Sequence, residues 1–327
     1  MREARVSQRM GDETVTMNCT RRDLAKLALA ALPASRLLAK PNSKFGGVQI
    51  GINAPYSFHG MPADADSVLQ DILQLNLSAV ELRSQPVEQF YGAPVIPASG
   101  RNATPEQRAA QSAAAEALQK WRLAAPMSKF KEFRKKYEDA GVLIQIVKFD
   151  GVDSMSDDVA DYTFNLAKEL GAHAISCEIP VSKTKWYGQF AAKHKMMVGY
   201  HGHTNITSPE AFGRPESWET AMSFSRYNGI NLDIGHFVAG NSKSPVEFLK
   251  KYADRITHIH LKDRKTNNGP NVVWGQGDTP VKEVLQLMKK EKYRFQGTIE
   301  FEYPVPQGSD QMKEIARCVE FCREALA

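Results

Sequence analysis

The region that decides the fold contains two short apolar runs, and each run ends in polar residues. The first reads Asn231-Leu232-Asp233-Ile234-Gly235-His236, and the second reads His258-Ile259-His260-Leu261-Lys262-Asp263-Arg264. Short apolar runs of this kind are typical of strands buried on both faces of a parallel sheet. Alternation along a strand puts the two histidines of the second run on the same face. The region therefore predicts parallel strands with polar side chains gathered at their carboxyl ends.

Similar runs recur along the chain from Gly46 onward and alternate with helical patterns. One helix is expected at Asp157–Leu170, with Ser156 as its N-cap and Gly171 just beyond its end. Eight βα units in about 280 residues predict an α/β fold of the (β/α)8 TIM barrel type, in a single domain over residues 40–327. A doubly wound sheet would require a glycine-rich fingerprint after its first strand, which residues 51–55 do not provide. The expected strands are Val48–Asn53, Ala79–Arg83, Val142–Lys148, Ala174–Glu178, Met196–His201, Ile230–Asp233, Ile256–Leu261 and Thr298–Glu302.

The segment Ser84–Ala125, after the second predicted strand, is too long for an ordinary βα connection. It contains several prolines and then an Ala/Gln-rich helical stretch at Pro105–Leu123. We interpret residues 84–125 as an insertion over the barrel mouth. The alternative is an arm that packs against a second subunit, which would make the protein a homo-oligomer.

Composition and charge exclude several classes of protein. The chain has 327 residues, 42% of them hydrophobic, and a formal charge of +5. These values are ordinary for a globular protein, and a surplus of this size does not predict a nucleic-acid partner. No apolar run reaches about 18 residues, so no membrane span is expected. The four cysteines form no CxxC pair, which indicates neither a redox site nor a zinc–thiolate site.

The N-terminal residues 1–39 carry seven basic and four acidic side chains, and they have the plan of an export signal. Paired arginines, Arg21 and Arg22, precede a moderately apolar run from Leu27 to Leu32. This plan resembles the bacterial twin-arginine signal and predicts export to the periplasm. The alternative is an amphipathic N-terminal helix on a cytoplasmic protein.

Aspartate, histidine and glutamate end three successive predicted strands. These residues are Asp233, His260 and Glu302. Histidine and carboxylate ligands together suit one divalent ion such as Mn, Co, Zn or Mg. His258 and Glu300 lie on the same strand faces but nearer the strand starts, so we expect them deeper in the barrel or behind the ligands.

These motifs resemble the sugar phosphate isomerase/epimerase superfamily, whose members are xylose isomerase-like barrels. The superfamily includes ketose 3-epimerases, hydroxypyruvate isomerase and inosose dehydratase. The resemblance covers roughly Val48 to the C-terminus and rests on residues 232–236 and 258–263, on Gly275-Gln276-Gly277 and on Glu302. It implies metal ligands at Asp233, His260 and Glu302, a substrate contact at His236, and a basic contact at Lys262 or Arg264.

The chain departs from the epimerases of this superfamily at the end of the fifth strand. The epimerases have a metal-binding glutamate there, whereas this chain has His201-Gly202-His203. In this respect it is more similar to inosose dehydratases, which have a histidine-rich fifth strand end. We predict Glu178, one strand earlier, as the fourth metal ligand, with His203 as its rival. A symmetric mechanism with two glutamates is correspondingly in doubt.

The resemblance implies chemistry that begins with removal of a proton next to a carbonyl group, with the metal as Lewis acid. Return of the proton gives epimerisation or isomerisation, and loss of a β-hydroxyl gives dehydration. Because no cradle of arginine and glycine for a phosphate is evident, an unphosphorylated sugar or keto-sugar is the expected substrate. The candidate catalytic residues are Glu302, Glu178, His203 and Lys262. The candidate substrate contacts are His201, His236, Arg264 and Trp274.

Two rival classes share the predicted fold. Apurinic endonucleases of the endonuclease IV type bind several metals and present a basic face to DNA, which the small charge surplus of this chain does not favour. A non-catalytic barrel that binds a sugar through a degenerate site is the other rival. Metal content separates the three classes, since the sugar enzyme would hold about one ion, the nuclease two or three and the degenerate barrel none.

Overall fold

The computed structural model describes residues 5–6, 17–18, 40–97 and 103–327. The chain divides into a unit over Met1–Lys40 and a second unit over Pro41–Ala327. In the first unit, β1 (Arg5–Val6) pairs antiparallel with β2 (Met17–Asn18). Apart from these four residues, the predicted export signal lies outside the described residues. Among the described helices, none combines the length and the apolar character that a membrane crossing requires.

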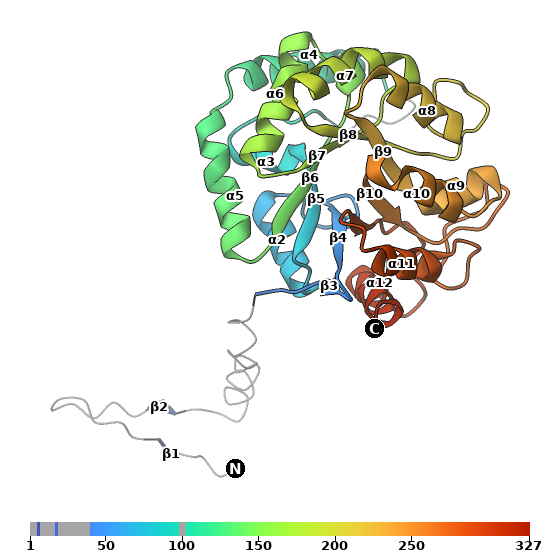
Figure 1. The fold of residues 1–327 in the computed structure, drawn as a ribbon. Coiled ribbons are helices and arrows are strands. Elements are labelled where there is room, and N and C mark those ends of the chain that lie inside the picture. The colour runs from blue at the N-terminus through green and yellow to red at the C-terminus, as the bar shows by residue number, and fades with distance from the viewer. Residues whose placement is uncertain (1–4, 7–16, 19–39, 98–102) are drawn as a thin grey trace. The chain divides into compact units, whose positions relative to one another are not determined.

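The second unit is a closed barrel of eight parallel strands, as the sequence predicts (Figure 1). Pairing of the last strand with the first, through Ile299 and Ile52, closes the barrel. A short strand, β3 (Lys44–Phe45), precedes the barrel and pairs antiparallel with its first strand. The barrel strands are β4 (Val48–Ala54), β5 (Ala79–Arg83), β6 (Leu143–Phe149), β7 (Ala174–Cys177), β8 (Met197–His201), β9 (Asn228–Asp233), β10 (Ile256–Leu261) and β11 (Gln296–Ile299).

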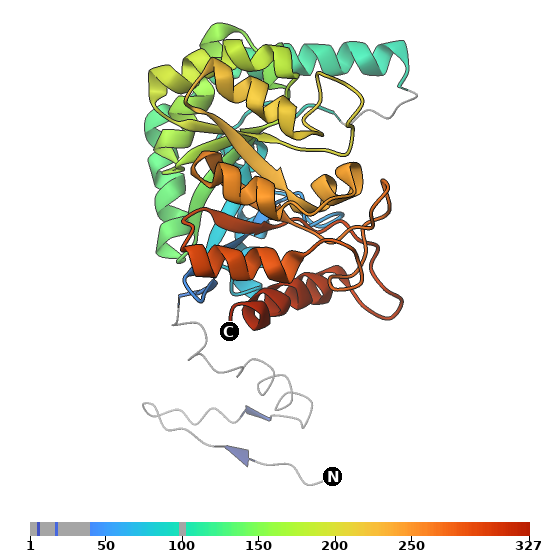
Figure 2. The same ribbon diagram turned by 45° about the vertical axis from the view of Figure 1, so that its right-hand side comes forward.

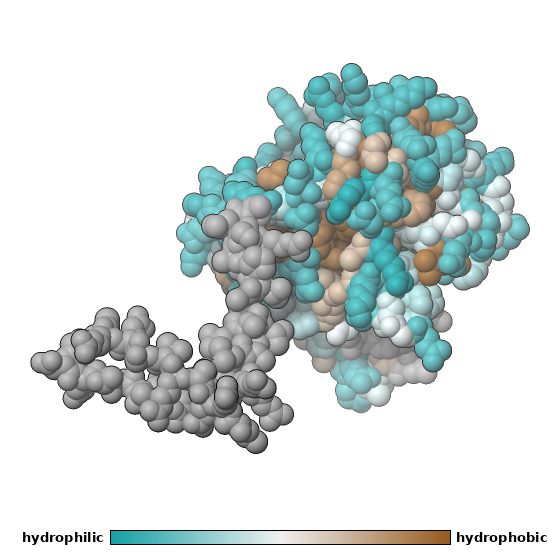
Figure 3. Space-filling model, turned by 90° about the horizontal axis from the view of Figure 1, so that it is seen from below, coloured by the Kyte–Doolittle hydropathy of each residue, from teal (hydrophilic) through white to brown (hydrophobic). Residues whose placement is uncertain are grey.

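Helices surround the barrel and begin where the sequence provides caps. Ser156 accepts a hydrogen bond from the Val159 amide at the start of the predicted helix, which is confirmed as α6, and Gly171 has φ +79° just beyond its end. On the face shown in Figure 3, hydrophilic side chains surround a central area where hydrophobic residues reach the surface. The helices are α2 (Ala65–Gln74), α3 (Ser84–Phe90), α4 (Pro105–Leu123), α5 (Phe130–Asp139), α6 (Asp157–Glu169), α7 (Thr184–His194), α8 (Pro215–Phe224), α9 (Ile234–Asn241), α10 (Val246–Tyr252), α11 (Val281–Glu291) and α12 (Gln311–Ala325).

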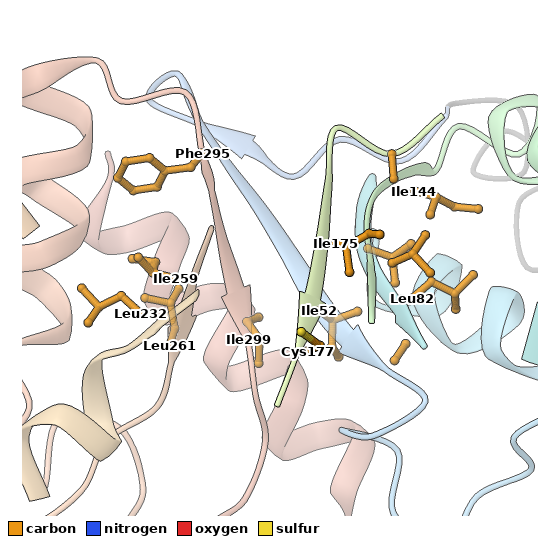
Figure 4. Close-up of a cluster of buried hydrophobic side chains, with 14 of the residues drawn as sticks. Ile52, Leu82, Ile144, Ile175, Cys177, Leu232, Ile259, Leu261, Phe295 and Ile299 are labelled. Carbon is orange, nitrogen blue, oxygen red and sulfur yellow. The ribbon is translucent and has the colours of Figure 1, made fainter. Parts of the chain in front are cut away.

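The hydrophobic core lies between the outer face of the barrel and the helices. Alternate residues of each strand contribute to it, such as Ile259 and Leu261 of β10 and Leu232 of β9 (Figure 4). These side chains are fully buried, and burial of each is worth about 1.5–3 kcal/mol. The residues between them, among them His258 and His260, must face the barrel interior.

Six of the eight strands differ from the prediction at one or both ends, and the difference is largest at the last strand. Strand β11 covers Gln296–Ile299, not Thr298–Glu302. Its pairing with β10 ends at Ile299 beside Leu261, where β10 also ends. Glu300 is therefore the first residue beyond β11, and Glu302 stands further out on the loop.

The predicted insertion contains α3 and α4, and α4 has the predicted bounds. Helix α4 packs against α6, and Arg122 near its end forms a buried ion pair with Glu88 of α3, with Nε and Oε1 2.7 Å apart. Residues 105–110 are all exposed, and this end of α4 projects from the barrel (Figure 2).

Candidate metal centre

The interior of the barrel is polar, although TIM barrels are ordinarily filled with branched apolar side chains. The inward positions of neighbouring strands carry charged, imidazole, amide and hydroxyl side chains. All of these residues are 3% exposed or less. They are Asn53, Glu81, Lys148, Ser176, His201, Asn231, Asp233, His258 and His260.

Four of the buried side chains, from four neighbouring elements, converge at the carboxyl end of the barrel. They are His201, Asp233, His260 and Glu300, and their ligand atoms lie within 4.8 Å of one another. His201 Nε2 lies 3.4 Å from Asp233 Oδ2 and 4.0 Å from Glu300 Oε2. His260 Nδ1 lies 3.9 Å from Asp233 Oδ2 and 3.2 Å from Glu300 Oε1. Ligands about 2.1 Å from a tetrahedral ion are roughly 3.4 Å apart, so this spacing fits a divalent metal.

Four ligand atoms of this group form no hydrogen bond with the described residues, although two of them, Asp233 Oδ2 and Glu300 Oε2, form ion pairs with Lys262. His201 Nε2, Asp233 Oδ2, His260 Nδ1 and Glu300 Oε2 are all buried without a hydrogen-bond partner among the described residues. The other oxygen of Asp233 accepts a hydrogen bond from the His236 amide at 2.7 Å and caps α9. Buried polar atoms without hydrogen bonds are costly. Here His201 Nε2 and His260 Nδ1 face two carboxylate oxygens, and this set of ligand atoms fits a divalent cation.

Two other buried side chains orient His260 and Glu300 of this group. Glu81 Oε2 lies 2.5 Å from His260 Nε2, which turns His260 Nδ1 toward the group. Asn53 donates a hydrogen bond to Glu300 Oε1 at 2.8 Å. Burial alone would lower the pKa of His260, but the carboxylates of Glu300 and Glu81 outweigh it and raise this pKa to about 10. The surroundings of His260 thus favour positive charge.

The ammonium group of Lys262 lies beside the four-residue group. Its Nζ lies 2.9 Å from Asp233 Oδ2 and 2.6 Å from Glu302 Oε2, and it also forms an ion pair with Glu300. Burial would lower the pKa of Lys262, but these carboxylates raise it above its usual value, so the side chain stays charged. A Cβ on Gly235 would lie 2.3 Å from Lys262 Cγ, so the path of this side chain requires glycine at position 235.

His236, on α9, lies between two basic side chains. Arg264 Nη1 is 2.6 Å from its Nδ1, and Lys262 Nζ is 3.2 Å from its Nε2. Burial holds the pKa of His236 well below its usual value, so the ring is neutral. Both basic groups only donate, so the neutral ring can accept a hydrogen bond from one of them at a time. Its Nε2 also lies 3.7 Å from Asp233 Oδ2.

Glu178 stands on one side of the barrel mouth, just beyond β7. Its side chain is 43% exposed, and its Oε2 is 2.9 Å from Nε2 of the half-exposed His203. Its Oε1 lies 3.4 Å from His201 Nδ1 and forms an ion pair with the buried Lys148. Burial would raise the pKa of Glu178, but hydrogen bonds from both histidines and the charge of Lys148 hold it well below its usual range.

Glu302 stands on the opposite side of the mouth. In the closed barrel, three strands separate β7 from β11 in either direction. Besides its ion pair with Lys262, Glu302 accepts hydrogen bonds from the Tyr56 hydroxyl at 2.6 Å and from Asn271 Nδ2 at 3.2 Å. The guanidinium of Arg83 lies 4.8 Å from the centre of the Tyr56 ring.

The loop after β10 is held by one carboxylate. Asp263 Oδ2 accepts hydrogen bonds from the amides of Gly275 and Gly277 at 2.8 and 2.9 Å. A Cβ on Gly277 would lie 1.8 Å from Asp263 Oδ1, so only glycine allows this approach. The predicted Gly275-Gln276-Gly277 motif therefore shapes the loop that follows Lys262 and Arg264.

The structure brings most of the predicted site residues together, but it groups them differently. The predicted ligands Asp233 and His260 lie in the four-residue group. Glu178 groups with His201 and His203, and Glu302 groups with His236 and Glu300. His201 and Glu300, rather than Glu178 and Glu302, complete the four-residue group with Asp233 and His260. Trp274 lies apart, with its ring edge-on to Phe321 of α12 at 5.7 Å.

Sequence reasoning missed three buried residues around the group: Glu81, Asn53 and Lys148. Each is a polar residue within an apolar strand, at an inward position near the carboxyl end. A charged side chain such as Glu81 in Ala79-Val80-Glu81-Leu82 is costly to bury unless it is paired. A polar residue within an apolar strand was therefore the feature of the sequence that could have revealed these three residues.

Comparison with known proteins agrees with this geometry. The family described as xylose isomerase-like TIM barrel matches residues 182–325. The match covers less than half of the chain, and the closed eight-stranded barrel agrees with the fold that the family's description names.

Particular relatives include inosose dehydratases. That of Clostridium botulinum (strain Eklund 17B / Type B) is 40% identical over 80 residues, which are 23% of this chain and 24% of the relative. The match thus spans about a quarter of the length of that protein.

Solved structures share the fold over most of the chain. D-psicose 3-epimerase from Clostridium cellulolyticum H10 has a TM-score of 0.59 at 13% identity, covering 85% of this chain and 99% of that one. A xylose isomerase domain protein from Planctomyces limnophilus has a TM-score of 0.56 at 17% identity, covering 86% and 97%.

Proposed function

We propose that this chain is a divalent-metal-dependent enzyme that isomerises or epimerises a sugar or keto-sugar by removing a proton next to a carbonyl group. The observation that carries the proposal is the convergence of four buried ligand atoms, none of them in a hydrogen bond with a described residue, between two carboxylates on opposite sides of the barrel mouth.

His201, Asp233, His260 and Glu300 would hold the ion in this proposal. His201 takes the position that we predicted for Glu178, and Glu300 takes that of Glu302. Two imidazoles with two carboxylates suit Mn, Co, Zn or Mg. When bound, such an ion supplies Lewis-acid polarisation of a substrate carbonyl.

Glu178 and Glu302 would then transfer protons. The ion pair with Lys148 and the contacts with two histidines keep Glu178 ionised, as a general base must be. Glu302 faces the substrate from the other side, beside the protonated Lys262. The ammonium group of Lys262 would neutralise charge that develops on a substrate oxygen. His236, held between Arg264 and Lys262, would contact the substrate.

Metal analysis with a matched pair of variants tests the site. Wild-type protein purified without chelator should hold about one divalent ion per chain. Asp233→Ala should lose it, whereas Asp139→Ala, which removes an exposed carboxylate paired with Lys135 in the preceding turn of α5, should keep it. Absence of metal from the wild type, even after incubation with excess ions, would overturn the proposal in favour of a non-catalytic sugar-binding barrel.

Hydrogen exchange tests the reaction. Keto-sugars incubated with the metal-loaded protein in D2O should gain deuterium at the carbon next to the carbonyl, as followed by NMR. Glu302→Gln should slow this exchange while it retains the metal. A metal-loaded protein that exchanges no proton of any keto-sugar would contradict the proton-transfer step.

Dehydration is the second candidate, because a possible general acid stands at the mouth. His203 lies 2.9 Å from Glu178 and half of its side chain is exposed, so it can protonate a departing hydroxyl. The similarity to inosose dehydratases supports this candidate. His203→Ala should then keep the metal and the hydrogen exchange but lose the unsaturated product, which ultraviolet absorbance detects. A wild type that exchanges protons without forming that product would exclude dehydration.

A further inference from the structure

A buried carboxylate lies across the barrel from the histidines of β10. Glu81 belongs to β5, and β4 and β11 separate β5 from β10 around the barrel. Its Oε2 lies 2.5 Å from His260 Nε2 and 3.2 Å from His258 Nε2. All three side chains have no exposed surface. One oxygen atom therefore faces two imidazole nitrogens in the interior of the barrel.

This contact limits where the imidazole protons lie. An ionised carboxylate only accepts hydrogen bonds, so a nitrogen that is hydrogen-bonded to Glu81 must donate. His258 Nε2 lies 3.2 Å from Glu81 but forms no hydrogen bond with it, and its Nδ1 lies 2.9 Å from the Thr257 hydroxyl, which donates to the Ile230 carbonyl. Burial lowers the pKa of His258 to about 4, in line with a neutral ring.

The same reasoning decides the tautomer of His260. Asn231 Nδ2 also lies near His260 Nε2, at 3.2 Å, but the shorter contact is with the charged oxygen of Glu81. Without an ion, Nδ1 can also donate to Glu300 Oε1, 3.2 Å away, and the ring is then positively charged. An ion held by the four-residue group would take the place of the proton on Nδ1, while Glu81 keeps the proton on Nε2.

We propose that Glu81 is a positioning residue that fixes His260 as an Nδ1 metal ligand, with His258 in contact behind the site as a non-ligating neighbour. This inference rests on the metal site of the proposed function. It explains why His258-Ile259-His260 contains two inward histidines, since only the one nearer the rim reaches the four-residue group. Partners of this kind behind a metal-binding histidine typically contribute 10- to 100-fold in metal affinity.

Metal affinity tests the role without reference to activity. In competition with a chromophoric chelator, Glu81→Gln should raise the dissociation constant of the metal about 10- to 100-fold, because the amide can donate to His260 and favour the wrong tautomer. Glu88→Gln is the matched control, since Glu88 is equally buried but pairs with Arg122 away from the site. It should lose stability and keep the wild-type affinity.

The outcomes separate this inference from the proposed function. Equal metal affinity of Glu81→Gln and wild type would overturn the role of Glu81 and leave the metal site standing. A wild type that binds no metal would overturn both. Should Glu81→Gln not fold, NMR of zinc-loaded wild type labelled with 15N-histidine gives the answer directly. A proton on His260 Nε2 supports the inference, and a proton on Nδ1 overturns it.

Discussion

Replacing Lys262 with methionine should destabilise the protein mainly when no metal is bound. The variant removes an ammonium group that pairs with Asp233 and Glu300, both buried, and with the half-buried Glu302. Breaking a buried pair by removing one partner costs about 3–5 kcal/mol, because the remaining charge stays buried. We expect a loss of this size in the free energy of unfolding of the metal-free protein.

A bound divalent ion changes this expectation. Asp233 and Glu300 then have another positive partner, so the loss should shrink by at least about 1.4 kcal/mol. By linkage, the same difference must appear as metal binding at least about tenfold tighter in the variant than in the wild type.

Urea unfolding followed by circular dichroism checks both statements, once with excess chelator and once with saturating metal. Lys265→Met is the control, because Lys265 is 45% exposed and its partner Asp278 lies at the surface, so little change is expected in either condition. An equal loss of stability for Lys262→Met with and without metal would refute the reasoning, since it would place the ion away from these carboxylates.

Three further predictions concern the framework of the site. Arg122→Met leaves Glu88 buried without its partner and should lower the free energy of unfolding by about 3–5 kcal/mol in urea titrations; a loss below about 1 kcal/mol would contradict a buried pair. Gly277→Ala should lower the melting temperature, because its Cβ would displace the Asp263 carboxylate, and an unchanged melting temperature would show that the loop can shift freely. Burial raises the pKa of the described thiols, so peptide mapping after native labelling at pH 8 should find little modification, and rapid labelling would contradict their burial; these are Cys177, Cys318 and Cys322.

The sequence was sufficient to predict the fold because the outward face of each strand always packs against the helices. Outward residues such as Ile259 are apolar whatever the inward residue is, so an apolar run indicated each barrel strand. Capping residues indicated the helices between the strands. The end of β11 was misplaced because Phe301, between Glu300 and Glu302, continues the alternation beyond the last pair with β10. The end of β11 is set by its hydrogen-bonded pairing with β10, which the alternation of polar and apolar residues does not reveal.

The site was predicted in its composition but not in its grouping. Motif spacing located Asp233 and His260, since each stands next to recognisable neighbours. The choice between Glu178 and His201, and between Glu302 and Glu300, depends on how far each strand extends toward the rim, which a register of one or two residues decides. Glu81 escaped notice because its partners are about 180 residues away in the sequence.

The alternation described for β8 to β11 also bears on how such a protein can change over evolutionary time. Substitution at an inward position alters chemistry without removing a single side chain from the layer between barrel and helices, so new reactions can arise on an unchanged scaffold. Deletion of one residue within a strand does the opposite, since it exchanges the two sets of side chains and loses both at once. We therefore expect variation among homologues of this chain to concentrate on inward residues and rim loops, with strand lengths held constant.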